Sequence, residues 1–211
     1  MTAPTAKEIS ALEDRSLTKG GQVMTFSGRL IDPFALEPDD VDLSDIIWGL
    51  SHTYRYGGQA DPGITVAEHS MLVAQVLNDP VWAPYALLHD ACEAYLGDVP
   101  APLKRSLRIE RGDLWWSFEE AERRVLVSVA RRFDLDPILI QDTTILKADL
   151  IVRDIERSAM ENMRWNEPVI PPGYEDFRPY FHDPSTARDL FRRSLMEAGI
   201  SMTQKKREAP F

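Results

Sequence analysis

The chain has 211 residues, of which 44% are hydrophobic and 27% are charged. These proportions are close to globular averages and exclude a disordered chain, and the length suits one domain. The 34 acidic residues against 24 basic ones give a formal net charge of -10. This charge repels long nucleic acids and disfavours duplex binding, although one pocket with placed cations could still take a small anion.

Cysteine usage and hydropathy indicate a water-soluble chain. Cys92 is the single cysteine, so no intrachain disulfide can form. The N-terminal residues lack the apolar stretch of a secretory signal, and the apolar runs are too short to span a bilayer. We therefore expect a cytoplasmic protein that does not associate with membranes.

The first part of the chain predicts an irregular lead-in followed by two helices. Residues 1–41 mix glycine, proline and aspartate with isolated apolar residues, which favours turns and a short hairpin. Cap-type residues and helical spacing predict a helix over 43–53. After a glycine-rich break, Thr65 and Glu68 have the spacing of a capping box, and the helix that they begin carries His69 on its apolar face.

The rest of the chain predicts further helices separated by most of the 15 prolines. These elements give an all-α fold, a helical bundle in one domain whose core runs from about 42 to 198, followed by a frayed tail over 199–211. The predicted helices span about 81–96, 114–133, 137–162 and 184–198.

A metal site is indicated by "LLHDACEAYLGD", in which His89 and Asp90 lie within an apolar helical segment. Burial of an ionised carboxylate without a partner costs about several kcal/mol, unless its pKa rises and the group takes up a proton. A bound cation is the simplest compensation. His69 and Asp149 lie on apolar faces of two other helices and are the matching candidates. Such mixed nitrogen and oxygen ligands suit one divalent zinc, cobalt, manganese or iron ion.

The segments "VAEHS", "LLHDACEAYLGDVPAPLK" and "LKADL" resemble the H…HD…D pattern of HD-domain phosphohydrolases. Within that superfamily the similarity is to the branch of YfbR-like 5'-deoxynucleotidases and DatZ-like phage enzymes, over residues 27–157. The resemblance implies an HD fold in which His69, His89, Asp90 and Asp149 are the metal ligands. It is also compatible with a phage origin.

The resemblance also assigns roles around the metal. Glu93 matches the catalytic carboxylate, and Asp98 matches a residue that orients the attacking water, although Asp98 could instead close the turn after Gly97. Arg55 and Lys104 match phosphate-binding positions, although either could be a solvated surface charge. Trp48 is a weaker candidate for contact with a nucleobase.

The expected reaction is metal-dependent removal of phosphate from a 2'-deoxynucleotide. Deoxynucleoside 5'-monophosphates are the leading substrates, and a triphosphohydrolase acting on deoxynucleoside triphosphates of the dATP type is the alternative. Other HD branches cleave cyclic nucleotides or dinucleotides, often with two metals, but no extra histidines flank His89 and Asp90. An alternative from another class is a non-catalytic nucleotide-sensing module with a structural metal. By resemblance we expect a homo-oligomer, a dimer or a hexamer.

Overall fold

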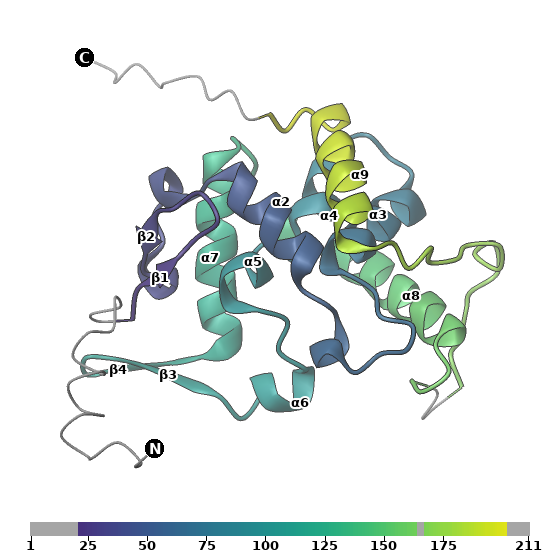
Figure 1. Ribbon diagram of the computed structural model, residues 1–211, viewed down its shortest axis with the longest axis horizontal. Coiled ribbons are helices and arrows are strands. Elements are labelled where there is room, and N and C mark those ends of the chain that lie inside the picture. Colours follow the sequence, from purple (N-terminus) through teal and green to yellow (C-terminus); the bar gives the residue numbers. More distant parts are fainter. Residues whose placement is uncertain (1–20, 164–166, 202–211) are drawn as a thin grey trace, which may run out of the picture.

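The computed structural model describes residues 21–163 and 167–201 (Figure 1). Residues 1–20 of the predicted lead-in and residues 202–211 of the predicted tail lie outside this part. The helices are α2 (Leu43–His52), α3 (Val66–Leu77), α4 (Ala83–Leu88), α5 (Glu93–Leu96), α6 (Ala101–Lys104), α7 (Phe118–Arg132), α8 (Thr143–Ala159) and α9 (Pro184–Glu197). Short 3-10 turns are η1 (Pro33–Ala35), η2 (Pro38–Asp40), η3 (Tyr56–Gly58) and η4 (Leu139–Gln141).

The fold is mixed, so the all-α prediction is wrong. Two antiparallel two-stranded sheets accompany the helices: β1 (Val23–Met24) with β2 (Leu30–Ile31), and β3 (Arg108–Arg111) with β4 (Leu114–Ser117). The first sheet is the short hairpin expected in the lead-in. The second replaces the first turn of the helix predicted from residue 114.

The β3–β4 hairpin is stabilised by a two-residue turn. Arg111 pairs with Leu114, so Gly112 and Asp113 connect the strands, and Gly112 has a φ of 61°. Glycine adopts this left-handed conformation without a Cβ penalty. The hairpin leaves Trp115 64% exposed.

The bundle is built around α3, which lies beside α4, α8, α9 and α2 (Figure 1). Asp42 caps α2 by accepting the Ser44 N–H, and the Thr65 hydroxyl caps α3 by accepting the Glu68 N–H. Glu68 does not complete a capping box, because its buried carboxylate accepts the backbone N–H groups of residues 180–182. This contact attaches the segment before α9 to α3.

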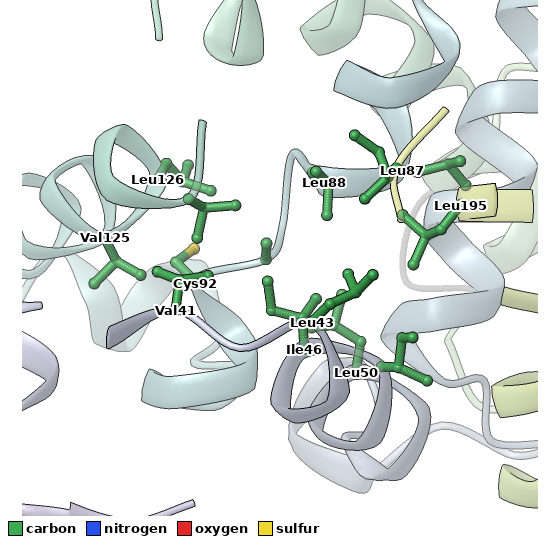
Figure 2. Close-up of a cluster of buried hydrophobic side chains, with 14 of the residues drawn as sticks. Val41, Leu43, Ile46, Leu50, Leu87, Leu88, Cys92, Val125, Leu126 and Leu195 are labelled. Carbon is green, nitrogen blue, oxygen red and sulfur yellow. The ribbon is translucent and has the colours of Figure 1, made fainter. Parts of the chain in front are cut away.

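One hydrophobic cluster joins most of these helices. Figure 2 shows Leu87 and Leu88 of α4 facing α2 and α9, with Cys92 lying toward α7. Cys92 is buried among apolar side chains. None of the helices in the described part of the chain combines the length and the apolar character that a bilayer crossing requires.

The helix predicted over residues 81–96 is divided into α4 and α5. Between them the backbone makes tight i to i+3 hydrogen bonds, from Ala91 N–H to Leu88 O at 3.0 Å and from Glu93 N–H to Asp90 O at 2.9 Å. His89 and Asp90 lie in this tighter turn between the two helices.

Candidate metal centre

Three side chains from two parts of the chain converge at one point. His69 comes from the first half of α3, and His89 and Asp90 come from the turn between α4 and α5. Their ligand-type atoms all lie within 4.8 Å of one another. The Asp90 Oδ2 atom is 3.2 Å from His89 Nε2 and 3.7 Å from His69 Nε2. These three residues form a group that could hold a metal ion.

The two imidazole rings are oriented by their Nδ1 atoms. His69 Nδ1 lies 2.8 Å from Glu156 Oε1, and His89 Nδ1 lies 2.7 Å from the Ala86 carbonyl oxygen. Because both partners accept, each Nδ1 carries the proton and donates it. In the neutral form that binds a metal, each ring then presents its Nε2 lone pair to the cluster.

The Nε2 atoms lack partners that would explain their burial. Both are buried, and in the part of the chain that the structure describes neither makes an aligned hydrogen bond. A buried nitrogen without a hydrogen bond costs about 1–3 kcal/mol. Two such atoms beside one carboxylate are satisfied together by a cation, so the donor set fits a divalent metal ion with borderline ligand preference.

The charges of the cluster are strongly coupled. Burial lowers the pKa of His89, but the neighbouring Asp90 carboxylate outweighs burial and raises the pKa to about 9. Burial raises the pKa of Asp90, but His89 and His69 hold it well below its usual range. Without a cation the site is therefore an imidazolium–carboxylate cluster, and a binding cation displaces protons.

Asp149, the fourth predicted ligand, reaches the cluster from α8. Its Oδ1 atom lies 3.1 Å from His69 Nε2. It is not part of the three-residue group within 4.8 Å. Asp149 therefore lies beside the group as a candidate fourth ligand.

Glu156 is a residue of the site that the sequence analysis missed. Its carboxylate, which is 0% exposed, contacts His69 through Oε1 and accepts from Arg55 Nε at 3.2 Å and Tyr56 Oη at 2.8 Å through Oε2. Glu156 follows Asp149 by seven residues, or two helical turns, so both lie on the same face of α8. That spacing was the available signal.

Arg55 lies at the cluster, as predicted, but it is paired rather than free. Its Nη1 atom is 3.4 Å from Asp90 Oδ2, and its Nε atom donates to Glu156. Burial opposes the charge, but Glu156 and Asp90 raise the pKa of Arg55 well above its usual value. The guanidinium is a fixed positive charge beside Asp90.

Glu93 and Lys104 form a second charged group together with Glu122 of α7. Lys104 Nζ lies 2.5 Å from Glu122 Oε1 and 3.5 Å from Glu93 Oε1. Glu93 is 4% exposed, and in the described part of the chain its Oε2 atom has no hydrogen-bond partner. Burial and the nearby Asp90 raise the pKa of Glu93 well above its usual value. Glu122 was not predicted.

Asp98 connects the two loops that border the cluster. Its Oδ2 atom accepts the Gly57 N–H at 2.9 Å, which ties the turn after α5 to the glycine-rich loop that begins at Arg55. Gly57 has a φ of 61°. The contact joins two loops that are distant in the sequence, and so differs from closure of the turn after Gly97, the alternative considered for Asp98.

Trp48, the predicted base contact, is covered on both faces. Phe26 stacks on one side at a centroid distance of 4.2 Å, and His52 stacks on the other at 4.0 Å. A nucleobase would have to displace one of these rings to stack on Trp48. The stack accounts for His52, which was not expected to bind metal.

The chain was compared with known proteins. It matches no protein-family model. It is 36% identical over 121 residues to the uncharacterized protein RCAP_rcc00048 of Rhodobacter capsulatus, covering 54% of this chain and 58% of that protein. It is 33% identical over 135 residues to the uncharacterized protein YfdR of Escherichia coli, covering 64% of this chain and 70% of YfdR. At this identity and coverage, the chain belongs to the same family as YfdR.

Proposed function

We propose that the chain is a metal-dependent phosphohydrolase of the HD superfamily that removes phosphate from 2'-deoxynucleotides. The observation that carries the proposal is the convergence of two buried imidazole Nε2 atoms, neither with an aligned hydrogen bond among the described residues, on the Asp90 carboxylate. Zinc, cobalt, manganese or iron would suit these ligands, with Asp149 completing the set. Such an ion would polarise a phosphoryl oxygen and lower the pKa of a coordinated water.

The protein's own side chains have separate roles in this proposal. Arg55 supplies a fixed positive charge beside Asp90 for a phosphoryl oxygen, and Lys104 supplies a second one beside Glu93. Glu93 holds a proton because its pKa is raised by burial and by neighbouring carboxylates, and it can donate this proton to the leaving oxygen. Asp98 holds the Arg55 loop in place through the Gly57 N–H.

Monophosphates fit the observed cations better than triphosphates do. Both Arg55 and Lys104 are already paired with carboxylates, and a triphosphate needs further positive charge that these residues do not supply. We therefore propose deoxynucleoside 5'-monophosphates as the substrates. Triphosphate hydrolysis of the dATP type is the alternative, and both would leave Trp48 in its ring stack.

The rival from another class is a nucleotide-sensing module with a structural metal. A structural metal site has every coordination position filled by protein ligands, whereas two histidines and two carboxylates leave positions open for water and substrate in an octahedral sphere. Within the ranges that the structure describes, the Oε2 atom of the buried Glu93 beside the cluster also makes no hydrogen bond. These features favour the enzyme.

The test is release of phosphate, pyrophosphate and triphosphate from a panel of deoxyribonucleotides and ribonucleotides with added Co²⁺, Mn²⁺ or Zn²⁺. The variant is Asp90→Asn, and the matched control is Asp113→Asn in the exposed turn of the β3–β4 hairpin. We expect metal-dependent phosphate release that Asp90→Asn reduces by about 100-fold or more, since even outer-shell changes cost 10–100-fold. No cleavage of any nucleotide with any of these metals would reject the proposal.

A further inference from the structure

Glu156 is placed between the metal ligands and the nearest positive charge. Its two oxygens have different partners: Oε1 lies 2.8 Å from His69 Nδ1, while Oε2 accepts from Arg55 and Tyr56. Glu156 belongs to α8, and its side chain is completely buried. A buried carboxylate is costly without compensating donors, and these three donors supply the compensation.

The Oε1 contact controls His69. A carboxylate that accepts from one imidazole nitrogen fixes the ring orientation and keeps the lone pair on the other nitrogen. Here that other atom is Nε2, which faces Asp90 at 3.7 Å and Asp149 at 3.1 Å. Removing the Oε1 acceptor would free the ring to rotate or to change tautomer.

The Oε2 contacts control the loop that begins at Arg55. Tyr56 has a φ of 59°, a conformation that is unfavourable for a residue with a Cβ. Burial and Glu156 raise the pKa of Tyr56 above its usual value, so the phenol keeps its proton and donates it. Arg55 is held with Nε on Glu156 and Nη1 at 3.4 Å from Asp90.

We infer that Glu156 is a positioning residue that couples the metal site to the anion site, because one carboxylate fixes both His69 and the Arg55 guanidinium. The inference rests on the proposed function in taking the cluster as the metal centre and Arg55 as the phosphate contact. Its consequence is that one substitution at Glu156 weakens both metal and phosphate binding. A substitution at Tyr56 weakens phosphate binding alone.

The experiment uses the full chain and two probes, Co²⁺ alone and inorganic phosphate added to the Co²⁺-loaded protein, each measured by isothermal titration calorimetry. The variants are Glu156→Gln and Tyr56→Phe, and the matched control is Glu161→Gln, at an exposed position just beyond α8. We expect Glu156→Gln to weaken Co²⁺ binding by about 10–100-fold and to weaken phosphate binding as well. Tyr56→Phe should keep wild-type Co²⁺ affinity and lose phosphate affinity.

A folded Glu156→Gln variant with wild-type affinity for Co²⁺ and for phosphate would overturn the inference. If circular dichroism shows that this variant does not fold, Glu156→Asp decides instead. Aspartate keeps the negative charge opposite Arg55, but its shorter side chain cannot reach His69 and Arg55 together. Weaker Co²⁺ binding by Glu156→Asp supports the coupling, and wild-type Co²⁺ affinity rejects it.

These binding measurements separate the inference from the proposed function. Neither probe is a nucleotide, so a wild-type protein that binds Co²⁺ and phosphate but cleaves no deoxynucleotide would reject the proposed function alone. An active enzyme whose Glu156→Gln variant binds both probes normally would reject the inference alone.

Discussion

Replacing Gly49 by alanine should destabilise the protein, although the same change stabilises most helices. Gly49 lies in α2, and a Cβ at this position would be 2.8 Å from both the Cα and the Cβ of Ala94 and 3.0 Å from its carbonyl oxygen. Two of these three atoms belong to the backbone of α5, so α5 itself must move. Overpacking of this kind costs about 1–3 kcal/mol.

Alanine is favoured over glycine in a helix by about 1 kcal/mol, which opposes this cost. Because two of the three contacts are with backbone atoms, the overpacking cost is expected in the upper part of its range, about 2–3 kcal/mol. The expected net loss for Gly49→Ala is then about 1–2 kcal/mol of unfolding free energy, or a Tm lower by about 2–8 °C for a chain of this size. Because α5 begins at Glu93, its displacement should also lower phosphate release. Thermal unfolding followed by circular dichroism provides the measurement.

The control is a double-mutant cycle with Ala94→Gly. This second change removes the Ala94 Cβ but leaves the Cα and carbonyl contacts, and it carries its own helix-propensity cost, so the double variant should lose less stability than the sum of the two single losses. A Gly49→Ala protein as stable as the wild type, or more stable, would refute the reasoning, because helix propensity would then outweigh the contact with α5.

Two further predictions concern regions away from the cluster. Hydrogen bonds at the start of α9, first that from the Ser185 side chain, lower the pKa of Asp183. The stabilisation by Asp183 is therefore present above the unfolded pKa of about 3.9 and is lost as the pH falls. The urea midpoint of Asp183→Asn should fall less than that of the wild type between pH 7 and about pH 3, and equal falls would contradict this prediction. Trp48→Ala should lower the Tm by removing the stack with Phe26 and His52, while leaving the KM for deoxynucleoside monophosphates unchanged; a raised KM at wild-type Tm would instead identify Trp48 as a base contact.

Local signals predicted several helix ends well. Asp42 and Thr65 are N-caps because their side-chain oxygens accept backbone N–H groups that the helix leaves unpaired. Gly97 ends α5 with a φ of 77°. Signals of this kind depend on only a few neighbouring residues, so they can be recognised in the sequence.

The hairpin at residues 108–117 was missed because two local patterns competed. Trp115, Trp116 and Phe118 have a spacing compatible with a helix, while Gly112 with Asp113 has the composition of a two-residue turn. The contact of Arg124 with the Trp116 ring, at 4.2 Å, favours the hairpin by packing β4 on α7. Such a contact is visible only after the chain has folded.

The residues of the candidate metal site were predictable because the sequence places polar, ionisable side chains in a segment that its apolar neighbours mark as buried. His89 and Asp90 lie in an apolar segment, where uncompensated polar groups are costly. Glu156 gave no such signal, since its neighbours include Arg153, Asp154 and Arg157, and a charged run indicates a solvated helix face. Only the approach of Arg55, 101 residues earlier in the chain, makes the carboxylate a buried partner.

The charges at the centre connect cation binding with phosphate binding. Asp90, Asp149 and Glu156 place three carboxylates near Arg55, so without a dication much of the positive field of Arg55 is offset and is not available to an anion. Arg55 is paired with Asp90 and Glu156. A dication bound by Asp90 would offset part of this negative charge, so Arg55 would attract an anion more strongly. Since linkage is reciprocal, phosphate should then tighten the binding of the cation by the same factor. Glu156, which contacts both His69 and Arg55, lies where these two equilibria meet.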